Sequence, residues 1–116
     1  MRYCPSERDE QGAVVEYLRY RGLLFSHAPN EGKRSPVTAG ILKSMGMSPG
    51  FPDLFIYEPR GKFHGLAIEM KSKKGRPTDE QKKWIARLNE NGYAAYIAYG
   101  ADEAIRIIES YDKEGT

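Results

Sequence analysis

The sequence contains one cysteine, two histidines and no long uninterrupted run of apolar residues. Because Cys4 is the single cysteine, an internal disulfide is excluded, and with only His27 and His64 beside it there is no zinc-type ligand spacing. No apolar run approaches the roughly 18 residues that span a bilayer, and residues 1–6 lack the apolar stretch of a secretory signal. These absences predict a cytoplasmic protein without a structural zinc or a membrane segment.

An excess of charge is also missing, since 18 Lys and Arg residues nearly balance 16 Asp and Glu residues, for a net charge of +2. The whole-molecule charge therefore does not indicate a nucleic-acid-binding protein. The distribution is more informative, because Lys71, Lys73, Lys74 and Arg76 fall within six residues. Such a basic run favours contact with a phosphate backbone, although most such runs are only solvated charged surface.

What the sequence does have is the composition of an ordinary globular protein, with 40% hydrophobic and 29% charged residues. A chain of 116 residues is long enough for one modest hydrophobic core and too short for two. The prediction is a single domain over residues 1–116.

Periodicity and capping signals predict the first half of the fold. Ser6 has the position of an N-cap for a helix over residues 6–21, which Gly22 ends, and residues 23–27 have the composition of a short strand. A long segment over residues 31–52 follows, in which residues 37–45 are compatible with a short helix. Two strands over residues 53–57 and 63–71, joined by a turn-rich link, predict an antiparallel hairpin.

The second half of the chain alternates helix and strand. Thr78 and Gln81 have the spacing of a capping box, which predicts a helix that ends at Asn91 and Gly92. A strand over residues 93–99 and a helix over residues 102–111 follow. The buried stripe of this last helix is predicted to consist of Ala104, Ile105 and Ile108. The fold class is thus α/β, with a small sheet flanked by helices in the order α-β-β-β-α-β-α.

The predicted hairpin brings together the residue types that support phosphodiester hydrolysis. Residues two apart in a strand face the same side, so Glu69 and Lys71 project together. Asp53 begins the antiparallel partner strand and should lie at the same end of the hairpin. Two adjacent carboxylates repel each other, and a hard cation such as Mg²⁺ relieves that repulsion through oxygen coordination. Such a cation activates water and neutralises phosphate charge, while a lysine stabilises the transition state.

Each of these motifs is short and arises often by chance. A Glu and a Lys two residues apart frequently form only an exposed surface pair. The context favours a functional interpretation, because Glu69 and Lys71 place charges in a strand whose neighbours are apolar.

The motifs as a set resemble the PD-(D/E)XK nuclease superfamily, and in particular its VRR-NUC (virus-type replication-repair nuclease) family. The resemblance covers roughly residues 6–110, which makes chance a poor explanation. It rests on the segments Phe51-Pro52-Asp53-Leu54-Phe55-Ile56, Gly65-Leu66-Ala67-Ile68-Glu69-Met70-Lys71, His27-Ala28-Pro29-Asn30-Glu31-Gly32, Met45-Gly46, Pro49-Gly50, Gly75-Arg76, Gln81, Trp84 and Asn91-Gly92-Tyr93.

The resemblance implies a PD-(D/E)XK restriction-endonuclease-like core and assigns roles to individual residues. Asp53, Glu69 and the backbone carbonyl of Met70 are implied as metal ligands, and Lys71 as the catalytic lysine. The family also implies a glutamate from the first helix. Glu10, one turn before Val14, is the preferred candidate for metal binding and catalysis, and Glu7 is the alternative. Either residue is also an ordinary acid of a helix's first turn.

Further residues are implied around the substrate. Gln81 resembles a glutamine that faces the active site in many members, a role that can coexist with its place in the capping box. Trp84 is interpreted as a core residue, because a single aromatic at helical spacing is more often packing than a stacking platform. His27 is interpreted as structural. The candidates for DNA contact are Asn30, Lys33, Lys73, Lys74 and Arg76.

The resemblance implies a Mg²⁺-dependent deoxyribonuclease, with Mn²⁺ as a possible substitute. Stand-alone members of the family are similar to structure-specific nucleases, so the expected substrate is branched or structured DNA, as in resolvases of four-way junctions or flap nucleases. It further implies a homodimer, a part in DNA repair, and a phage or bacterial host cell.

Two other functions are compatible with the residues. The first is a catalytically inactive nucleic-acid-binding module of the same fold, although Asp53, Glu69 and Lys71 are all present. The second is an RNA-binding domain that stacks bases on Tyr93, Tyr96 and Tyr99. The apolar content of that strand argues against it, because it predicts burial.

Overall fold

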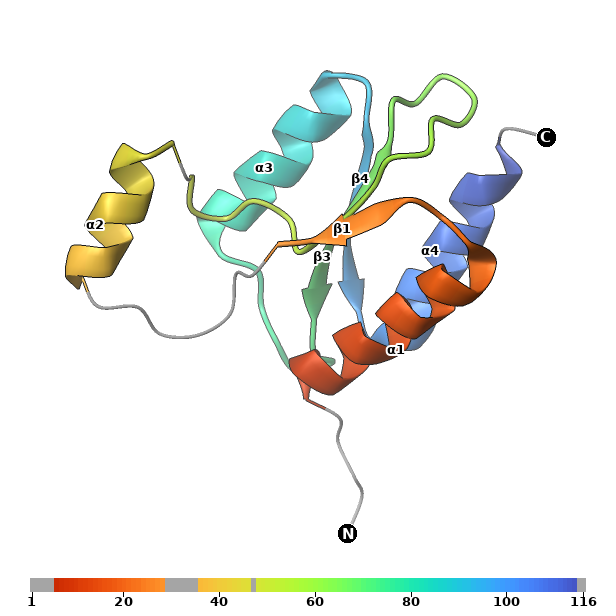
Figure 1. Cartoon of the computed structure of the whole chain (residues 1–116), viewed down its shortest axis with the longest axis horizontal. Helices are drawn as coiled ribbons and strands as arrows, with labels where there is room; N and C mark the ends of the chain where they lie inside the picture. Colours follow the sequence, from red (N-terminus) through yellow and green to blue (C-terminus); the bar gives the residue numbers. More distant parts are fainter. Residues whose placement is uncertain (1–5, 29–35, 47, 115–116) are drawn as a thin grey trace, which may run out of the picture.

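The structure, a computed structural model, describes residues 6–28, 36–46 and 48–114, apart from the side chain of Glu7 (Figure 1). Four helices flank a mixed four-stranded sheet in an α/β arrangement. In chain order the elements are α1 (Glu7–Arg21), β1 (Phe25–His27), α2 (Pro36–Ser44), β2 (Leu54–Ile56), β3 (Leu66–Lys71), α3 (Asp79–Glu90), β4 (Ala94–Tyr99) and α4 (Ala101–Lys113).

The sheet has the strand order β1-β2-β3-β4. β2 and β3 are antiparallel with Leu54 opposite Ile68, which confirms the predicted hairpin. β1 is antiparallel to β2, whereas β4 is parallel to β3. A parallel pair requires a crossover connection, and α3 provides it.

The hydrophobic core lies between the sheet and the helices α1 and α4. Figure 1 shows these two helices together on one side of the sheet, with α3 on the other. Alternate residues of β2 and β3 face α1 and α4 and are buried, and the two helices contribute their own apolar side chains. The buried core residues of these four elements include Val14, Leu18, Leu54, Ile56, Leu66, Ile68, Met70, Ala104 and Ile108.

Helix α1 has both of its predicted end signals. Ser6 is the N-cap, and its hydroxyl accepts a hydrogen bond from the Asp9 backbone N–H while the Asp9 carboxylate accepts one from the Ser6 backbone. Gly22 ends the helix in the left-handed conformation, with φ at 70°, a geometry that favours glycine. The predicted helix over residues 6–21 is therefore confirmed.

Helix α4 differs from its prediction in its bounds, which are Ala101–Lys113 in place of residues 102–111, and in its buried residues. It begins at Ala101, one residue before the predicted start, and its buried residues are Ala101, Ala104, Ile108 and Tyr111. The assignment of Ile105 to the buried stripe is wrong, because this side chain is only half-buried. The steps of three, four and three residues place the buried stripe along one face, and Ile105 lies at its border.

The sheet edge at β4 is covered by a side chain from α3. The Asn89 amide donates to the Ala95 carbonyl at 3.1 Å, and the Ala95 N–H donates to the Asn89 carbonyl oxygen at 3.0 Å. These bonds occupy backbone groups that an edge strand otherwise leaves open. The expected burial of the tyrosines in β4 is wrong, because Tyr96 and Tyr99 are 44% and 37% exposed. They remain exposed because β4 is an edge strand.

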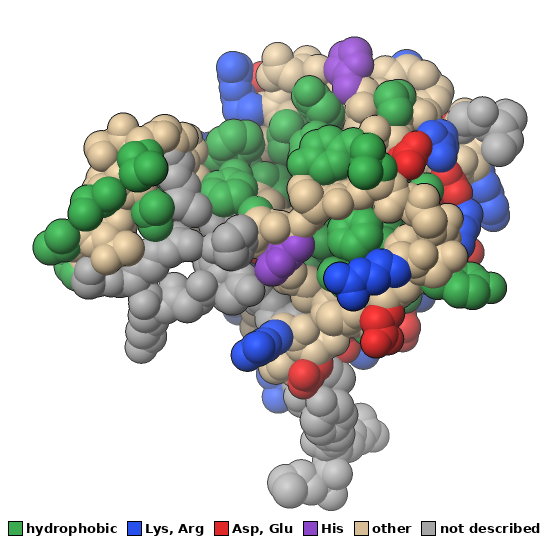
Figure 2. Space-filling model, viewed as in Figure 1, with side chains coloured by type: hydrophobic (Ala, Val, Ile, Leu, Met, Phe, Trp, Pro, Cys, Tyr) green, Lys and Arg blue, Asp and Glu red, His purple; other side chains and the backbone are tan. Residues whose placement is uncertain are grey.

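Helix α2 stands apart from the rest of the domain, at the left in Figure 1. None of its residues is buried, and its apolar side chains Val37 and Ile41 are exposed. Figure 2 shows apolar side chains on the surface of this helix. None of the helices in the described part of the chain is long and apolar enough to cross a membrane.

Candidate active site

The antiparallel pairing of β2 and β3 brings Asp53 and Glu69 together. Asp53 immediately precedes β2, and the register that pairs Leu54 with Ile68 places Asp53 opposite Glu69. The Met70 N–H donates to Oδ2 of Asp53 at 2.8 Å. Both carboxyl groups are almost fully buried, with Asp53 4% and Glu69 1% exposed. Charged groups are rarely buried to this extent without a specific partner, so these two residues are the candidate functional site.

Lys71 joins the two carboxyl groups on the same face of the sheet. Its Nζ lies 3.8 Å from Oε2 of Glu69, and its side chain is only 12% exposed. The spacing of two residues along β3 produces this pairing, because alternate side chains share a face. The predicted patch of Asp53, Glu69 and Lys71 therefore exists as a compact group.

The electrostatics of the site are dominated by desolvation. Burial raises the pKa of Asp53 above its ordinary value of 3.8. Hydrogen bonds with the Glu69 side chain and the Met70 backbone, and the charges of Lys71 and His27, act in the opposite direction. A proton held between the two carboxyl groups, or a cation in its place, relieves their repulsion.

Gln81 combines the two roles considered for it. Its Oε1 accepts from the Thr78 N–H at 2.8 Å, while Oγ1 of Thr78 accepts from the Gln81 N–H at 3.1 Å, which completes the capping box of α3. Its Nε2 donates to Oε2 of Glu69 at 3.1 Å. The cap therefore aims the amide at Glu69, and the bond from Nε2 to Oε2 orients the carboxylate.

Glu10 is placed at the start of α4. Its Oε2 accepts a hydrogen bond from the Ala101 N–H, so the carboxylate occupies a helix N-terminus, where negative charge is favourable. The preceding Gly100 has φ at 93°, and a Cβ there would come within 2.7 Å of the same oxygen. In residues 6–28, 36–46 and 48–114, no three His, Cys, Asp or Glu side chains form a group that could hold a metal ion. The structure thus unites Asp53 with Glu69 but engages Glu10 elsewhere, and the Glu7 side chain lies outside the described part.

Three of the five candidate residues for DNA contact lie in the described part of the chain. Lys73, Lys74 and Arg76 are exposed in the link that leads from β3 to α3. The aliphatic stem of Lys73 lies beside Gly100, at the end of the sheet that also carries Lys71. Asn30 and Lys33 fall outside the described residues.

His27 lies exposed at the end of β1, whose continuation anchors Asp53. The Ala28 N–H donates to the Asp53 carbonyl at 2.7 Å. The charge of His27 lowers the pKa of Asp53, although less than the bonds to Glu69 and Met70 do. The histidine is therefore near the site without being a part of the carboxylate cluster.

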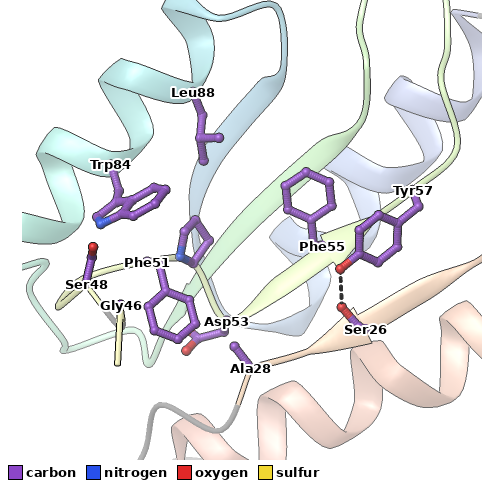
Figure 3. A pocket seen from close by; sticks show the side chains of 11 residues that line it. Ser26, Ala28, Gly46, Ser48, Phe51, Asp53, Phe55, Tyr57, Trp84 and Leu88 are labelled. Carbon is purple, nitrogen blue, oxygen red and sulfur yellow. Dashed lines mark hydrogen bonds between the residues drawn. The ribbon is translucent and has the colours of Figure 1, made fainter. Parts of the chain in front are cut away.

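An aromatic cavity beside Asp53 was not predicted from the sequence. It has a volume of about 380 Å³ and is lined by Phe51, Asp53, Phe55 and Trp84, among others (Figure 3). The assignment of Trp84 to the core is wrong, because this side chain is half-buried and forms a wall of the cavity. Its spacing of three residues from Gln81 and the position of Phe51 near Asp53 were signals for it.

Comparison with known proteins agrees with this architecture. The family model of the VRR-NUC domain matches residues 6–102. A solved structure described as a VRR_NUC domain protein is 31% identical, covers 97% of this chain and 93% of its own, and superposes with a TM-score of 0.84. No curated protein matches the chain.

The fold and the buried carboxylates beside a lysine define a domain of the nuclease type, with an α/β core. The chain belongs to the VRR-NUC domain family. This is a nuclease domain family, and its substrate is nucleic acid.

Proposed function

We propose that the protein is a Mg²⁺-dependent DNA endonuclease whose active site consists of Asp53, Glu69 and Lys71. The observation that supports this best is the burial of two adjacent carboxyl groups with a lysine 3.8 Å from one of them. A site built only for stability gains little from such a group, because desolvation of its charges opposes folding.

The donor set fits a hard divalent cation. Asp53 and Glu69 supply oxygen ligands from two strands, and the Met70 carbonyl is the third proposed ligand. Mg²⁺ is the proposed cofactor, with Mn²⁺ as an alternative. When bound, the cation supplies Lewis acidity toward the phosphate and a lower pKa for water.

The protein's own residues then perform distinct tasks. Glu69 is oriented by the Gln81 amide, and Asp53 by the Met70 N–H. Lys71 is positioned to stabilise the negative charge that develops on the phosphate as water attacks phosphorus and the leaving oxygen departs. Glu10 supports the site through the start of α4, next to the Gly100 N–H that donates to the Lys71 carbonyl at 2.9 Å.

Branched or structured DNA is the proposed substrate, cut by a homodimer in the cytoplasm of a bacterial or phage-infected cell. This part of the proposal is supported by membership of the VRR-NUC family. The exposed apolar side chains Val37 and Ile41 of α2, with Met45 directly after the helix, are compatible with a contact between two copies. Lys73, Lys74 and Arg76 are the proposed phosphate contacts near the site.

The test is cleavage of labelled four-way junction, flap, duplex and single-stranded DNA with Mg²⁺, Mn²⁺ or EDTA. The wild type is compared with Lys71→Ala, Asp53→Asn and the control Lys62→Ala, an exposed lysine of the link at the opposite end of the hairpin. We expect metal-dependent cutting by the wild type and the control, and its loss in the two site variants. If folded wild type binds DNA with Mg²⁺ but cuts none, the protein is instead an inactive binding module.

A further inference from the structure

Two cavities adjoin each other along α3, on the face of the sheet that carries the carboxylates. The aromatic cavity contains Asp53 at one end and is bounded by Trp84 and Leu88 of α3. The second, which we name the basic cavity, has a volume of about 480 Å³ and is lined by Lys83, Trp84, Arg87, Leu88, Asn91 and Tyr93. The two cavities share Trp84 and Leu88 as lining residues, so they lie next to each other along α3.

The walls of the aromatic cavity suit a flat ring. The Phe51 and Trp84 rings meet edge to face, with centroids 6.5 Å apart and an angle of 67° between their planes. Phe55 lies across the cavity from them in Figure 3. A volume of about 380 Å³ falls within the range of about 300–1,000 Å³ that is usual for small-ligand sites. The aromatic cavity is therefore large enough for a nucleobase and has the side chains on which bases stack.

Polar groups are present in both cavities. Oγ of Ser26 and the Tyr57 hydroxyl are 2.6 Å apart beside the aromatic cavity. Lys83 and Arg87 bring positive charge to the basic cavity, although Arg87 also contacts Glu90 at 3.3 Å. Cations beside aromatic rings are the combination that single-stranded nucleic acid requires, because its phosphates are charged and its bases are apolar on their faces.

The presence of Asp53 in the wall of the aromatic cavity indicates which ligand the cavity binds. A phosphate that reacts at Asp53 and Glu69 carries a base one sugar away, and Asp53 is one of the residues that line the aromatic cavity. Within a continuous duplex that base is stacked and paired, so its entry into the cavity costs the free energy of unstacking and unpairing. An unpaired base can enter without that cost.

We propose that the aromatic cavity binds an unpaired nucleobase of the DNA strand at the active site, and that the basic cavity binds the next nucleotide of that strand. The proposal rests on the nuclease function proposed above and makes it more specific. The preferred substrate has single-stranded nucleotides directly beside the scissile phosphate, and Phe51 and Trp84 recognise them by stacking.

Trp84 is the only tryptophan in the chain, so its fluorescence reports on the cavity directly. Full-length Lys71→Ala protein, with Mg²⁺, is titrated with a DNA fork that carries short unpaired arms and with a continuous duplex of the same length. We expect quenching of Trp84 fluorescence by the fork and none by the duplex. Single abasic sites are then placed at each position of the unpaired arms.

One abasic position next to the branch should abolish the quenching and weaken binding by about fivefold to a hundredfold. Phe51→Leu should weaken binding of the fork by a similar factor and leave duplex binding unchanged. Tyr20→Leu is the matched control, because Tyr20 is 86% exposed on α1, and it should change neither. The abasic scan leaves the protein intact, so it stays decisive if Phe51→Leu fails to fold.

The outcomes separate this inference from the proposed function. If wild type cuts DNA with Mg²⁺ but no abasic position alters quenching or binding, the base-binding cavity is wrong and the nuclease function stands. If Trp84 fluorescence depends on protein concentration and not on DNA, a second copy of the chain occupies the cavity and the inference is overturned. If wild type neither cuts nor binds any DNA, the proposed function fails as well.

Discussion

The two faces of the sheet are built from the same strands and serve opposite purposes. Toward α1 and α4, β3 presents Leu66, Ile68 and Met70, which are fully buried in an apolar core. Toward α3, the alternate residues Glu69 and Lys71 carry charge. Burial on the first face stabilises the fold, at roughly 25 cal/mol per Å² of apolar surface removed from water. Burial on the second face opposes folding and raises the pKa of Asp53. The comparison teaches that stability and chemistry are separated by alternation along one strand.

The largest effect is expected from a substitution in the core, on the side of the sheet that faces α1 and α4. Ile108→Ala removes a fully buried side chain of α4 and should lower the free energy of unfolding by about 2–5 kcal/mol. Urea denaturation measures this change. Ile41→Ala on the exposed face of α2 is the control and should change the stability by less than about 0.5 kcal/mol. If both variants lost the same free energy of unfolding, the assignment of Ile108 to the stabilising core would be wrong.

The second effect concerns the chemical face. Lys71→Ala should lower the turnover rate by about 10²–10³-fold, because it removes a charge that stabilises the transition state. Its thermal unfolding should change less than that of Ile108→Ala, since the ion pair of the lysine with Glu69 is long, at 3.8 Å, and desolvation of the lysine's own charge opposes folding. Single-turnover cleavage and calorimetry on the same preparations test both parts. A variant that unfolds easily yet retains activity would reverse the assignment of the two faces.

The third effect tests the Gln81 amide as a positioning group. Gln81→Met removes the bond to Glu69 and should lower turnover by about tenfold, since hydrogen bonds to charged groups contribute about 1.5–3 kcal/mol. Thr78→Ala weakens only the cap of α3 and serves as the control. An equal decrease in activity in the two variants would indicate that Gln81 acts only through the cap. Titration of Mg²⁺ separates weaker metal binding from slower chemistry.

The fourth effect concerns the junction where β4 meets α4, which connects the two faces. Gly100→Ala should destabilise the protein by about 1–3 kcal/mol, because φ at 93° is strained for alanine and its Cβ would meet Glu10. Gly12→Ala in α1 has no atom within 4 Å of the added carbon and should stabilise the helix by up to about 1 kcal/mol. In thermal unfolding, Gly100→Ala should therefore lower the melting temperature and Gly12→Ala should raise it. A neutral Gly100→Ala would mean that the Glu10 contact is dispensable.

The smallest effect is a change of stability with pH in metal-free protein. The groups that act on Asp53 are Glu69, Lys71 and His27, and burial raises the pKa of Asp53 above 3.8. A folded-state pKa above the unfolded one means that the folded state binds more protons between the two values. Stability should therefore fall as the pH rises from about 3.8 through the higher pKa of folded Asp53. Unfolding with and without Asp53→Asn measures the contribution, which should vanish in the variant.

Much of the fold was predictable because its signals are local. The capping residues Ser6 and Thr78 define helix starts within a few positions, and their partners Asp9 and Gln81 are three residues away. The hairpin was predictable because a short turn-rich link permits only an antiparallel pair. These features depend on neighbours in sequence, so no knowledge of the tertiary structure was needed.

The predictions that were wrong concern residues whose burial depends on contacts between elements far apart in the chain. Ile105 has the right spacing for a buried face, yet α1 and the sheet cover its neighbours Ala104 and Ile108 more fully. Tyr96 and Tyr99 are exposed because β4 is an edge strand, a position that the strand's own residues do not reveal. Trp84 faces a cavity whose other walls include Phe51 and Phe55, from distant parts of the chain.

The sequence by itself determined which charged residues meet at the hairpin and which elements hold them. The period of two in β3 determines that Glu69 and Lys71 share a face, and the motifs around Asp53 identify the family. Only the tertiary structure decided that Gln81 bonds to Glu69, that Glu10 bonds to the start of α4, and that aromatic side chains enclose a cavity at Asp53. The physical reason is that alternation and capping are short-range geometry. A side chain's partner, by contrast, depends on how helices and strands far apart in the chain pack together.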